Sequence, residues 1–97
     1  MIIEVENNKY KLIKDYKEGF DKDLFLEKYT NYFENYDYIV GDIAYSKLRL
    51  KGFNKKKNKN FNKINDYNNL DKYIKENCAY GCKYFVLEKI SEENNVK

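Results

Sequence analysis

The residues best suited to chemistry in this sequence form a basic row between positions 47 and 63. Lys47, Arg49 and Lys51 alternate with leucines, so the pattern predicts that all three project from one face of a strand at intervals of about 6.8 Å. A row of cations next to exposed aromatic rings suits a single-stranded nucleic acid, because the cations follow the phosphates while the rings stack on bases. The sequence therefore predicts a nucleic-acid-binding surface made of Lys47, Arg49, Lys51, Phe53, Lys55, Lys56, Lys57, Lys59, Phe61 and Lys63.

The distribution of charge singles out the same stretch. The formal net charge is +3, but residues 1–42 hold six lysines and ten acids, and residues 66–97 hold five lysines and six acids. Residues 43–65 hold seven lysines and one arginine with no acid. The many lysines and asparagines, with a single arginine and no proline, are typical of an AT-rich genome whatever the function. That bias explains the number of lysines but not the absence of acids from one segment.

Two other interpretations of the basic row stay open. The loop lysines would then be merely solvated, and the basic face of the strand would lie under a helix with its lysine stems covering apolar surface. Alternatively, the row docks an acidic protein or a second copy of the chain. No RNP-type or helix-turn-helix signature supports nucleic-acid binding. RNA, free or on the ribosome, is nevertheless the expected ligand, and a protein-interaction or scaffold role is the alternative.

Cys78 and Cys82 are the other candidates for chemistry. Two thiols without any histidine do not complete a tetrahedral zinc site, so a metal would require a second copy of the chain. A redox pair is an alternative. We expect two buried, reduced cysteines that pack as small apolar side chains.

The remaining residues give no catalytic signature. The absence of histidine excludes Ser-His-Asp and Cys-His catalysis, and there is no glycine-rich phosphate loop. Asp42 lies five positions after Asp37, and an odd spacing places the two side chains on opposite faces of a strand. We expect Asp42 to neutralise Arg49 or Lys51 in the adjoining strand. The sequence thus indicates a protein that is not an enzyme and uses no cofactor.

Periodicity predicts the elements that position these residues. Short apolar runs predict two strands joined by a hairpin at Asn7–Asn8, and aromatic residues at helical spacing predict a helix that starts after Asp21. The stretch from residue 54 to 64 resembles a solvated, partly mobile loop. A second helix is expected from about Asp66. The expected strands cover residues 2–5, 10–13, 38–41, 47–53 and 84–87, and the last of these is central because its apolar residues do not alternate.

The order of these elements, ββ-α-ββ-α-β, predicts an α+β fold. We expect a two-layer sandwich in which two helices cover one face of a mainly antiparallel sheet. A single domain would span residues 1–90, with a basic loop at 54–65 and a frayed tail at 91–97. The first residues lack the pattern of a signal peptide and no apolar run is long enough to span a membrane, so we expect a cytoplasmic protein without membrane contact.

Three blocks of the sequence, taken in order, resemble the YutD-like family of small bacterial proteins. They are Tyr36–Asp42, Leu48–Phe53 and Cys78–Leu87, and the resemblance extends over about residues 8–90. It is weakest in the Lys/Asn-rich stretch at 54–65 and after Ile90. The resemblance implies a bacterial cytosolic protein with an α+β fold similar to the SecB-like arrangement. It implies no activity, and likeness to a chaperone at the level of fold carries no function with it.

Overall fold

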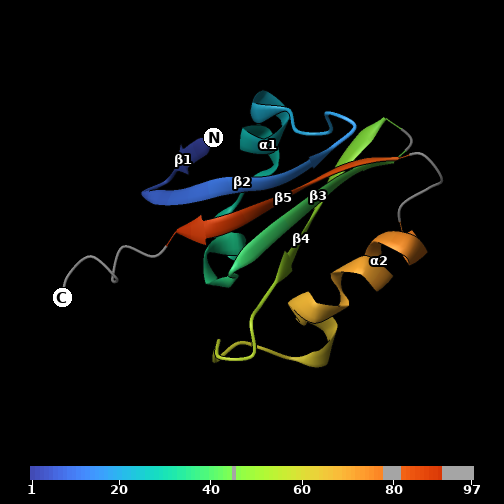
Figure 1. Ribbon diagram of the computed structural model, residues 1–97. Helices are drawn as coiled ribbons and strands as arrows, with labels where there is room; N and C mark the ends of the chain where they lie inside the picture. Colours follow the sequence, from blue (N-terminus) through green and yellow to red (C-terminus); the bar gives the residue numbers. More distant parts are fainter. Residues whose placement is uncertain (45, 78–81, 91–97) are drawn as a thin grey trace.

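The computed structural model describes residues 1–44, 46–77 and 82–90. One five-stranded antiparallel sheet dominates it, with the strand order β1-β2-β5-β3-β4 (Figure 1). The elements, in chain order, are β1 (Ile2–Val5), β2 (Asn8–Tyr16), α1 (Lys22–Lys28), the 3-10 helix η1 (Asn31–Asn35), β3 (Tyr38–Ala44), β4 (Lys47–Phe53), the 3-10 turns η2 (Lys63–Asn65) and η3 (Tyr67–Asn69), α2 (Leu70–Asn77) and β5 (Lys83–Ile90). The predicted α+β class and element order are confirmed.

The first hairpin turns one residue earlier than the sequence predicted. Glu6 and Asn7, rather than Asn7 and Asn8, have positive φ angles of 50° and 69°. Two consecutive residues with positive φ form the tight turn whose twist matches that of the two strands it joins. Asn8 already belongs to β2, where it lies opposite Val5.

The aromatic stripe that predicted one long helix is divided between two elements. Asp21 caps α1 as expected, since its Oδ1 accepts a hydrogen bond from the Leu24 amide at 3.2 Å. Helix α1 ends at Lys28, and Tyr29 adopts an extended conformation before η1 begins. Tyr32 of η1 is 62% exposed, whereas Phe25, Tyr29 and Phe33 are buried.

Strand β5 occupies the centre of the sheet, as its continuous apolar run predicted. Phe85 and Leu87 point to one face, where they pack with Phe25 of α1 and Tyr10 of β2. Val86 points to the other face. Gly41 of β3 leaves room for the Phe85 ring, which a side chain at that position would strike.

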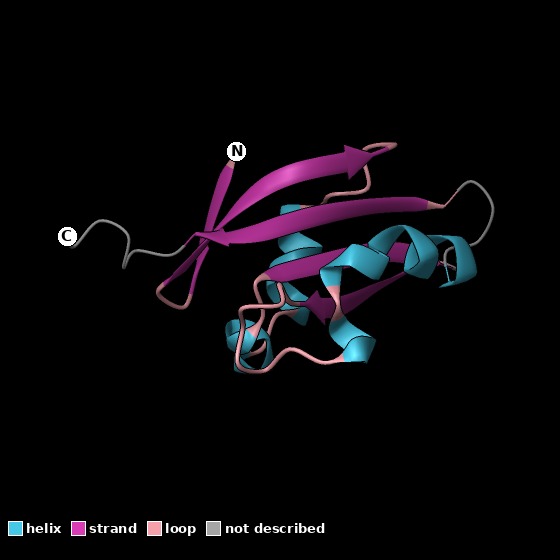
Figure 2. Ribbon diagram, turned by 60° about the horizontal axis from the view of Figure 1, so that its bottom comes forward, coloured by secondary structure: helices cyan, strands magenta, loops and turns pink. Residues whose placement is uncertain are grey.

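The expectation that both helices cover one face of the sheet is wrong. Helix α1 and η1 pack on the face of Phe85, whereas α2 packs on the opposite face against Val86 and Phe53 (Figures 1 and 2). The molecule therefore has three layers. The physical reason lies in β5, because a strand that is apolar on both faces needs a cover on each side.

No helix within the described residues is long and apolar enough to cross a membrane. The predicted tail at 91–97 lies outside the described residues.

Candidate interaction surface

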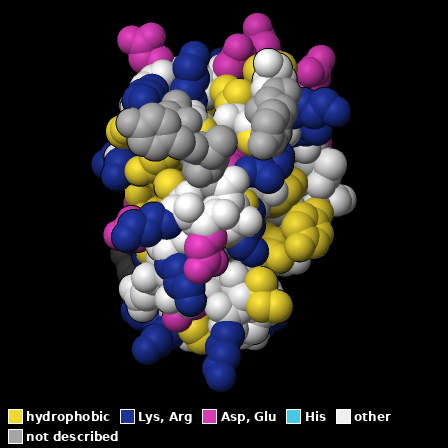
Figure 3. Space-filling view, turned by 90° about the vertical axis from the view of Figure 1, so that its right-hand side faces the viewer, with side chains coloured by type: hydrophobic (Ala, Val, Ile, Leu, Met, Phe, Trp, Pro, Cys, Tyr) yellow, Lys and Arg dark blue, Asp and Glu magenta, His cyan; other side chains and the backbone are white. Residues whose placement is uncertain are grey.

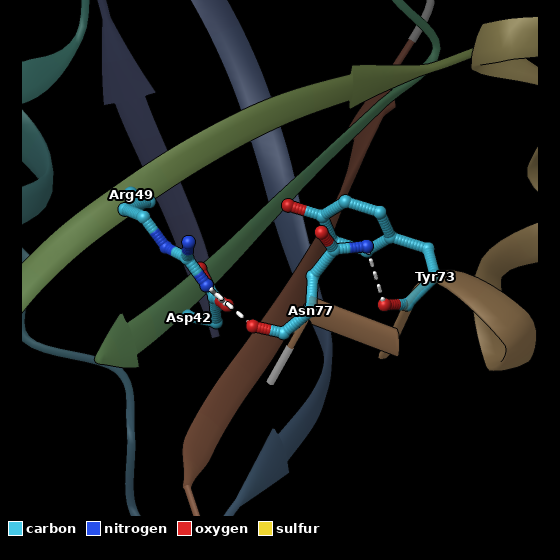
Figure 4. Close-up of polar contacts among 4 residues, drawn as sticks. All are labelled: Asp42, Arg49, Tyr73 and Asn77. Atoms are coloured by element: carbon cyan, nitrogen blue, oxygen red, sulfur yellow. Dashed lines mark hydrogen bonds and ion pairs between the residues drawn. The ribbon is translucent and has the colours of Figure 1, made fainter. Parts of the chain in front are cut away.

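Arg49 lies in the middle of β4, directly opposite Asp42 of β3. Its guanidinium donates to both carboxylate oxygens of Asp42, from Nε at 3.2 Å and from Nη2 at 2.6 Å. Nη2 also donates to the carbonyl oxygen of Asn77, the last residue of α2, at 2.7 Å (Figure 4). The predicted Asp42–Arg49 pair is thus confirmed, and it joins β3, β4 and α2.

Asp42 has a side chain that is only 1% exposed, whereas that of Arg49 is 47% exposed. A buried carboxylate needs a neighbouring cation, because transferring an unpaired charge from water to the protein interior costs much free energy. Arg49 therefore serves a structural role, and much of its hydrogen-bonding capacity is used within the chain.

Phe53 and Lys51 lie under α2 rather than on an open surface. Phe53 is 1% exposed, and its ring packs edge-on against Tyr73 of α2, with 5.4 Å between the ring centres. Lys51 is half-buried, with its Nζ 5.2 Å from the centre of the Phe53 ring and 5.7 Å from that of Tyr73. Burial raises the pKa of Tyr73 above its ordinary value. Phe53 was expected to be a ring on which bases stack, and that expectation is wrong because α2 covers this face.

Lys55 starts the basic loop and is tied to the sheet. Its backbone amide donates to Asp37 Oδ2 at 2.8 Å, and its Nζ lies 3.7 Å from Glu88 Oε2. The same Nζ is 5.7 Å from the centre of the Tyr38 ring, which stacks on Tyr67 with 3.6 Å between centres. Both the backbone and the side chain of Lys55 therefore already make contacts within the fold.

The asparagines of the basic loop hold it in one shape. Asn54 is fully buried, and its Oδ1 accepts hydrogen bonds from the Asp37 amide at 2.8 Å and from Asn58 Nδ2 at 3.0 Å. Its backbone amide donates to Asn65 O at 2.6 Å, while its carbonyl accepts from the Tyr67 amide at 3.0 Å. The two ends of the loop are therefore joined to each other.

A second set of asparagine contacts forms the turn η2. Asn62 Oδ1 accepts from the amides of Ile64 and Asn65, at 2.8 and 3.0 Å, and Asn65 Oδ1 accepts from the Asn62 amide at 2.9 Å. This reciprocal pair is a capping box. Asn65 Nδ2 also donates to Asn60 O at 3.1 Å. The loop is solvated, as expected, and its asparagine side chains supply the hydrogen bonds that a β ladder or a helix would supply elsewhere.

The other candidate lysines are exposed. They are Lys47 at the start of β4 and Lys56, Lys57, Lys59 and Lys63 in the loop. Phe61, the remaining candidate, is half-buried. On the side of the molecule shown in Figure 3, Lys and Arg side chains are spread among acidic, uncharged and hydrophobic ones, without a continuous basic face.

Sequence reasoning missed Ile64, which lies among these lysines. It is 78% exposed, more than any other large hydrophobic side chain of the described residues. It lines a hollow of about 200 Å³ between η2 and α2, together with Phe53 and Tyr73. A single isoleucine inside a run of lysines and asparagines is the signal that could have found it.

Of the two candidate cysteines, the structure describes Cys82. Cys78 lies outside the described residues. Cys82, just before β5, is half-buried and is not a free thiol, which departs from the expected pair of reduced cysteines. Within residues 1–44, 46–77 and 82–90, no group of three or more acidic or cysteine side chains could hold a metal ion.

Comparison with known proteins places this three-layer α+β architecture in a family. The model of the YutD-like family, described as "Putative antitoxin YutD-like", matches residues 4–88, so the chain belongs to that family. A Bacillus subtilis (strain 168) protein described as "Putative antitoxin YutD" is 40% identical over 89 residues, which are 92% of this chain and 98% of the relative. The solution NMR structure of yutD from B. subtilis matches with a TM-score of 0.78 and 40% identity, covering 93% of this chain and 82% of that one.

Proposed function

We propose that this chain is a cytoplasmic, non-enzymatic binding protein whose basic loop, residues 54–65, docks an acidic protein partner. The observation that carries the proposal is the ordered loop itself. The asparagine contacts hold it in one shape while Lys56, Lys57, Lys59 and Lys63 stay exposed. A preformed basic surface pays little ordering entropy on binding and attracts a partner of opposite charge.

The placement of the aromatic rings favours a protein over a single-stranded nucleic acid. Base stacking needs open rings, but Phe53 is buried, Tyr67 is stacked on Tyr38 and Phe61 is half-buried. The name antitoxin, which the B. subtilis relative bears, also implies a protein partner. RNA or the ribosome remains the second candidate, because exposed lysines in a segment that holds no acid, residues 43–65, also suit a phosphate backbone.

The test compares partner capture with and without RNA. Affinity-tagged protein is recovered from a lysate of producing cells, either untreated or digested with nuclease, and bound proteins are identified by mass spectrometry. We expect a protein partner that survives the digestion and is lost when Lys56, Lys57, Lys59 and Lys63 are all changed to alanine. Recovery that depends on intact RNA would favour the second candidate instead.

A matched variant controls for net charge. Changing Lys11, Lys22, Lys28 and Lys83 to alanine removes the same number of exposed lysines from outside the loop. We expect this variant to keep the partner. Equal loss in both variants would show that overall charge, rather than the loop, attracts the partner.

A further inference from the structure

Strand β4 forms one outer edge of the sheet (Figure 1). It pairs with β3 on one side, and no described strand lies on its other side. In an antiparallel pair, alternate residues direct their N–H and C=O groups away from the neighbouring strand. Among the described residues, no hydrogen bond outside the ladder with β3 uses the backbone of Lys47, Leu48, Leu50 or Lys51. The outer backbone groups of β4 are therefore able to pair with a further strand.

The accessible part of this edge is the first five residues of the strand, Lys47–Lys51. Lys47 is exposed and Lys51 is half-buried. Gly52, the next residue, is buried, and the Tyr36 ring fills the place that a side chain would take there. A further strand would therefore pair over about 17 Å, at about 3.4 Å per residue.

The accessible edge carries positive charge on the face of α2. Lys47 and Lys51 alternate with leucines and lie on this face together with Phe53. Arg49, between them, is balanced by Asp42, so the two lysines give this stretch its net charge. An incoming strand with acids on the same face would place them beside the lysines, and opposite charges on neighbouring strands stabilise the pairing.

The other face of the edge is apolar. Leu48 is buried and Leu50 is half-buried, and both pack in the core that contains Phe25 of α1. Helix α1 lies against β4, and its Leu24 and Leu26 are 40% and 38% exposed. Apolar side chains of an incoming strand would extend this core. The edge therefore matches a strand in which acidic and apolar residues alternate.

We propose that the outer edge of Lys47–Lys51 binds an extended, acidic segment of a protein partner as an additional antiparallel strand. The acids of that segment lie on the lysine side and its apolar residues on the side of α1. This pairing rests on the proposed function, since it names how the partner that the basic loop attracts is held. Backbone hydrogen bonds supply the affinity, and the alternating side chains supply the specificity.

Two other occupants fit this edge less well. A second copy that paired antiparallel about Arg49 would bring Lys47 of each chain opposite Lys51 of the other, and like charges directly opposite each other destabilise a sheet. A nucleic acid lacks the regular N–H and C=O groups that would continue the ladder.

The experiment uses the whole chain and a peptide of about nine residues with blocked ends, in which glutamate and valine alternate. One isomer of this peptide carries N-methyl groups on its valines and another on its glutamates, so each loses the amide protons of one edge while keeping every side chain. Because the acids face the lysines, one edge of the peptide faces β4. We expect one isomer to bind like the parent peptide and the other about tenfold more weakly in calorimetric titration. Equal binding of the two isomers would overturn the proposal.

Amide hydrogen exchange locates the bound peptide. Strand β3 protects alternate amides of Lys47–Lys51 in the free chain, and the parent peptide should slow exchange of the remaining ones about tenfold. Strand β1 is the control, because it forms the opposite edge of the sheet and carries Glu4. Slower exchange at β1, or none at β4, would contradict pairing at the proposed edge.

A matched pair of variants tests the charge of the edge. Lys47 and Lys83 are both exposed and each begins a strand, but β5 is an inner strand. Lys47→Glu should lower the affinity for the parent peptide about tenfold, because it places an acid beside the acids of the peptide. Lys83→Glu should change it less than about twofold. Equal losses would show that net charge, rather than this edge, attracts the peptide, and would overturn the proposal.

The outcomes separate this pairing from the proposed function. If the two isomers bind equally while the four-alanine loop variant loses the captured partner, the loop docks a partner and the edge does not. If the isomers differ while that variant keeps its partner, the edge binds an acidic strand and the role proposed for the loop is wrong. If exchange at β4 slows with protein concentration alone, the occupant is a second copy. If a uridine oligonucleotide slows it as the peptide does, the occupant is RNA. Each of the last two results would overturn the proposal.

Discussion

Arg49 shows how a residue that predicts binding can instead hold the fold together. Its guanidinium links Asp42 of β3 to Asn77 at the end of α2. It donates two hydrogen bonds to the Asp42 carboxylate and one to the Asn77 carbonyl oxygen. Asp42 is almost fully buried, and Arg49 is the cation that its carboxylate contacts. Lys47, two residues earlier on the same strand, is exposed. Two cations of one alternating pattern therefore have different roles.

Replacing Arg49 should destabilise the fold far more than replacing Lys47. We expect Arg49→Gln to lower the free energy of unfolding by about 2 kcal/mol, because it leaves Asp42 buried without its cation. This value lies below that for a fully buried pair, since Arg49 is half exposed. Lys47→Gln should change it by less than about 0.5 kcal/mol. Urea denaturation at neutral pH measures both, and equal losses would contradict the structural role of Arg49.

At the scale of the element, the basic loop owes its order to amides rather than to apolar packing. An AT-rich genome accounts for many asparagines, but it does not account for where their side chains lie. Asn54 joins the loop to Asp37 and Asn58, and Asn62 and Asn65 cap each other. Asn54 Nδ2 is also the buried side-chain polar atom of the described residues that has no hydrogen-bond partner. The nitrogen of the Asn54 side-chain amide therefore lacks a partner, while its oxygen accepts the two hydrogen bonds that hold the loop.

Removing the Asn54 side chain should loosen the whole loop. We expect Asn54→Ala to cost about 2 kcal/mol of unfolding free energy, because the half-buried Asp37 amide loses its acceptor and a small cavity remains where the buried side chain stood. Amide hydrogen exchange should also become faster at Asn58 and Phe61. Asn60→Ala is the control, because Asn60 is exposed and bonds through its backbone. An Asn54 variant as stable as the control would show that the loop does not depend on this amide.

At the scale of the whole molecule, the two faces of the sheet carry unequal cores. Among the described residues, the face of α1 buries nine hydrophobic residues that include Phe25, Phe85 and Leu87, whereas the face of α2 buries four. None of the residues of α2 itself is fully buried. Helix α2 is therefore held mainly by half-buried side chains and by Arg49.

This imbalance predicts that α2 opens before the sheet does. In native-state hydrogen exchange, we expect the amides of Tyr73–Asn77 to exchange at least tenfold faster than those of Phe85–Leu87. Equal protection of α2 and β5 in the free protein would contradict the unequal cores.

Local periodicity determined most of the elements. The strict alternation at 47–53 predicted β4 and its two faces, and the apolar run at 84–87 predicted the central strand. Asp21 was recognised as a cap, and the pairing of Asp42 with either Arg49 or Lys51 followed from two adjacent strands; the structure selects Arg49. These features depend on neighbours along the chain or across one ladder, so the sequence by itself contained enough information to predict them.

Only the tertiary structure decided what each surface faces. The sequence placed Phe53 on the basic side of β4, but it could not show that α2 crosses that side and buries the ring. It also could not show that Asn54 and Asn65 meet, since the two residues lie at opposite ends of the loop. Burial and loop order arise from contacts between segments distant in sequence, and the periodicity of one segment contains no information about another. For the same reason, the exposure of Ile64 beside Tyr73 became visible only in the folded chain.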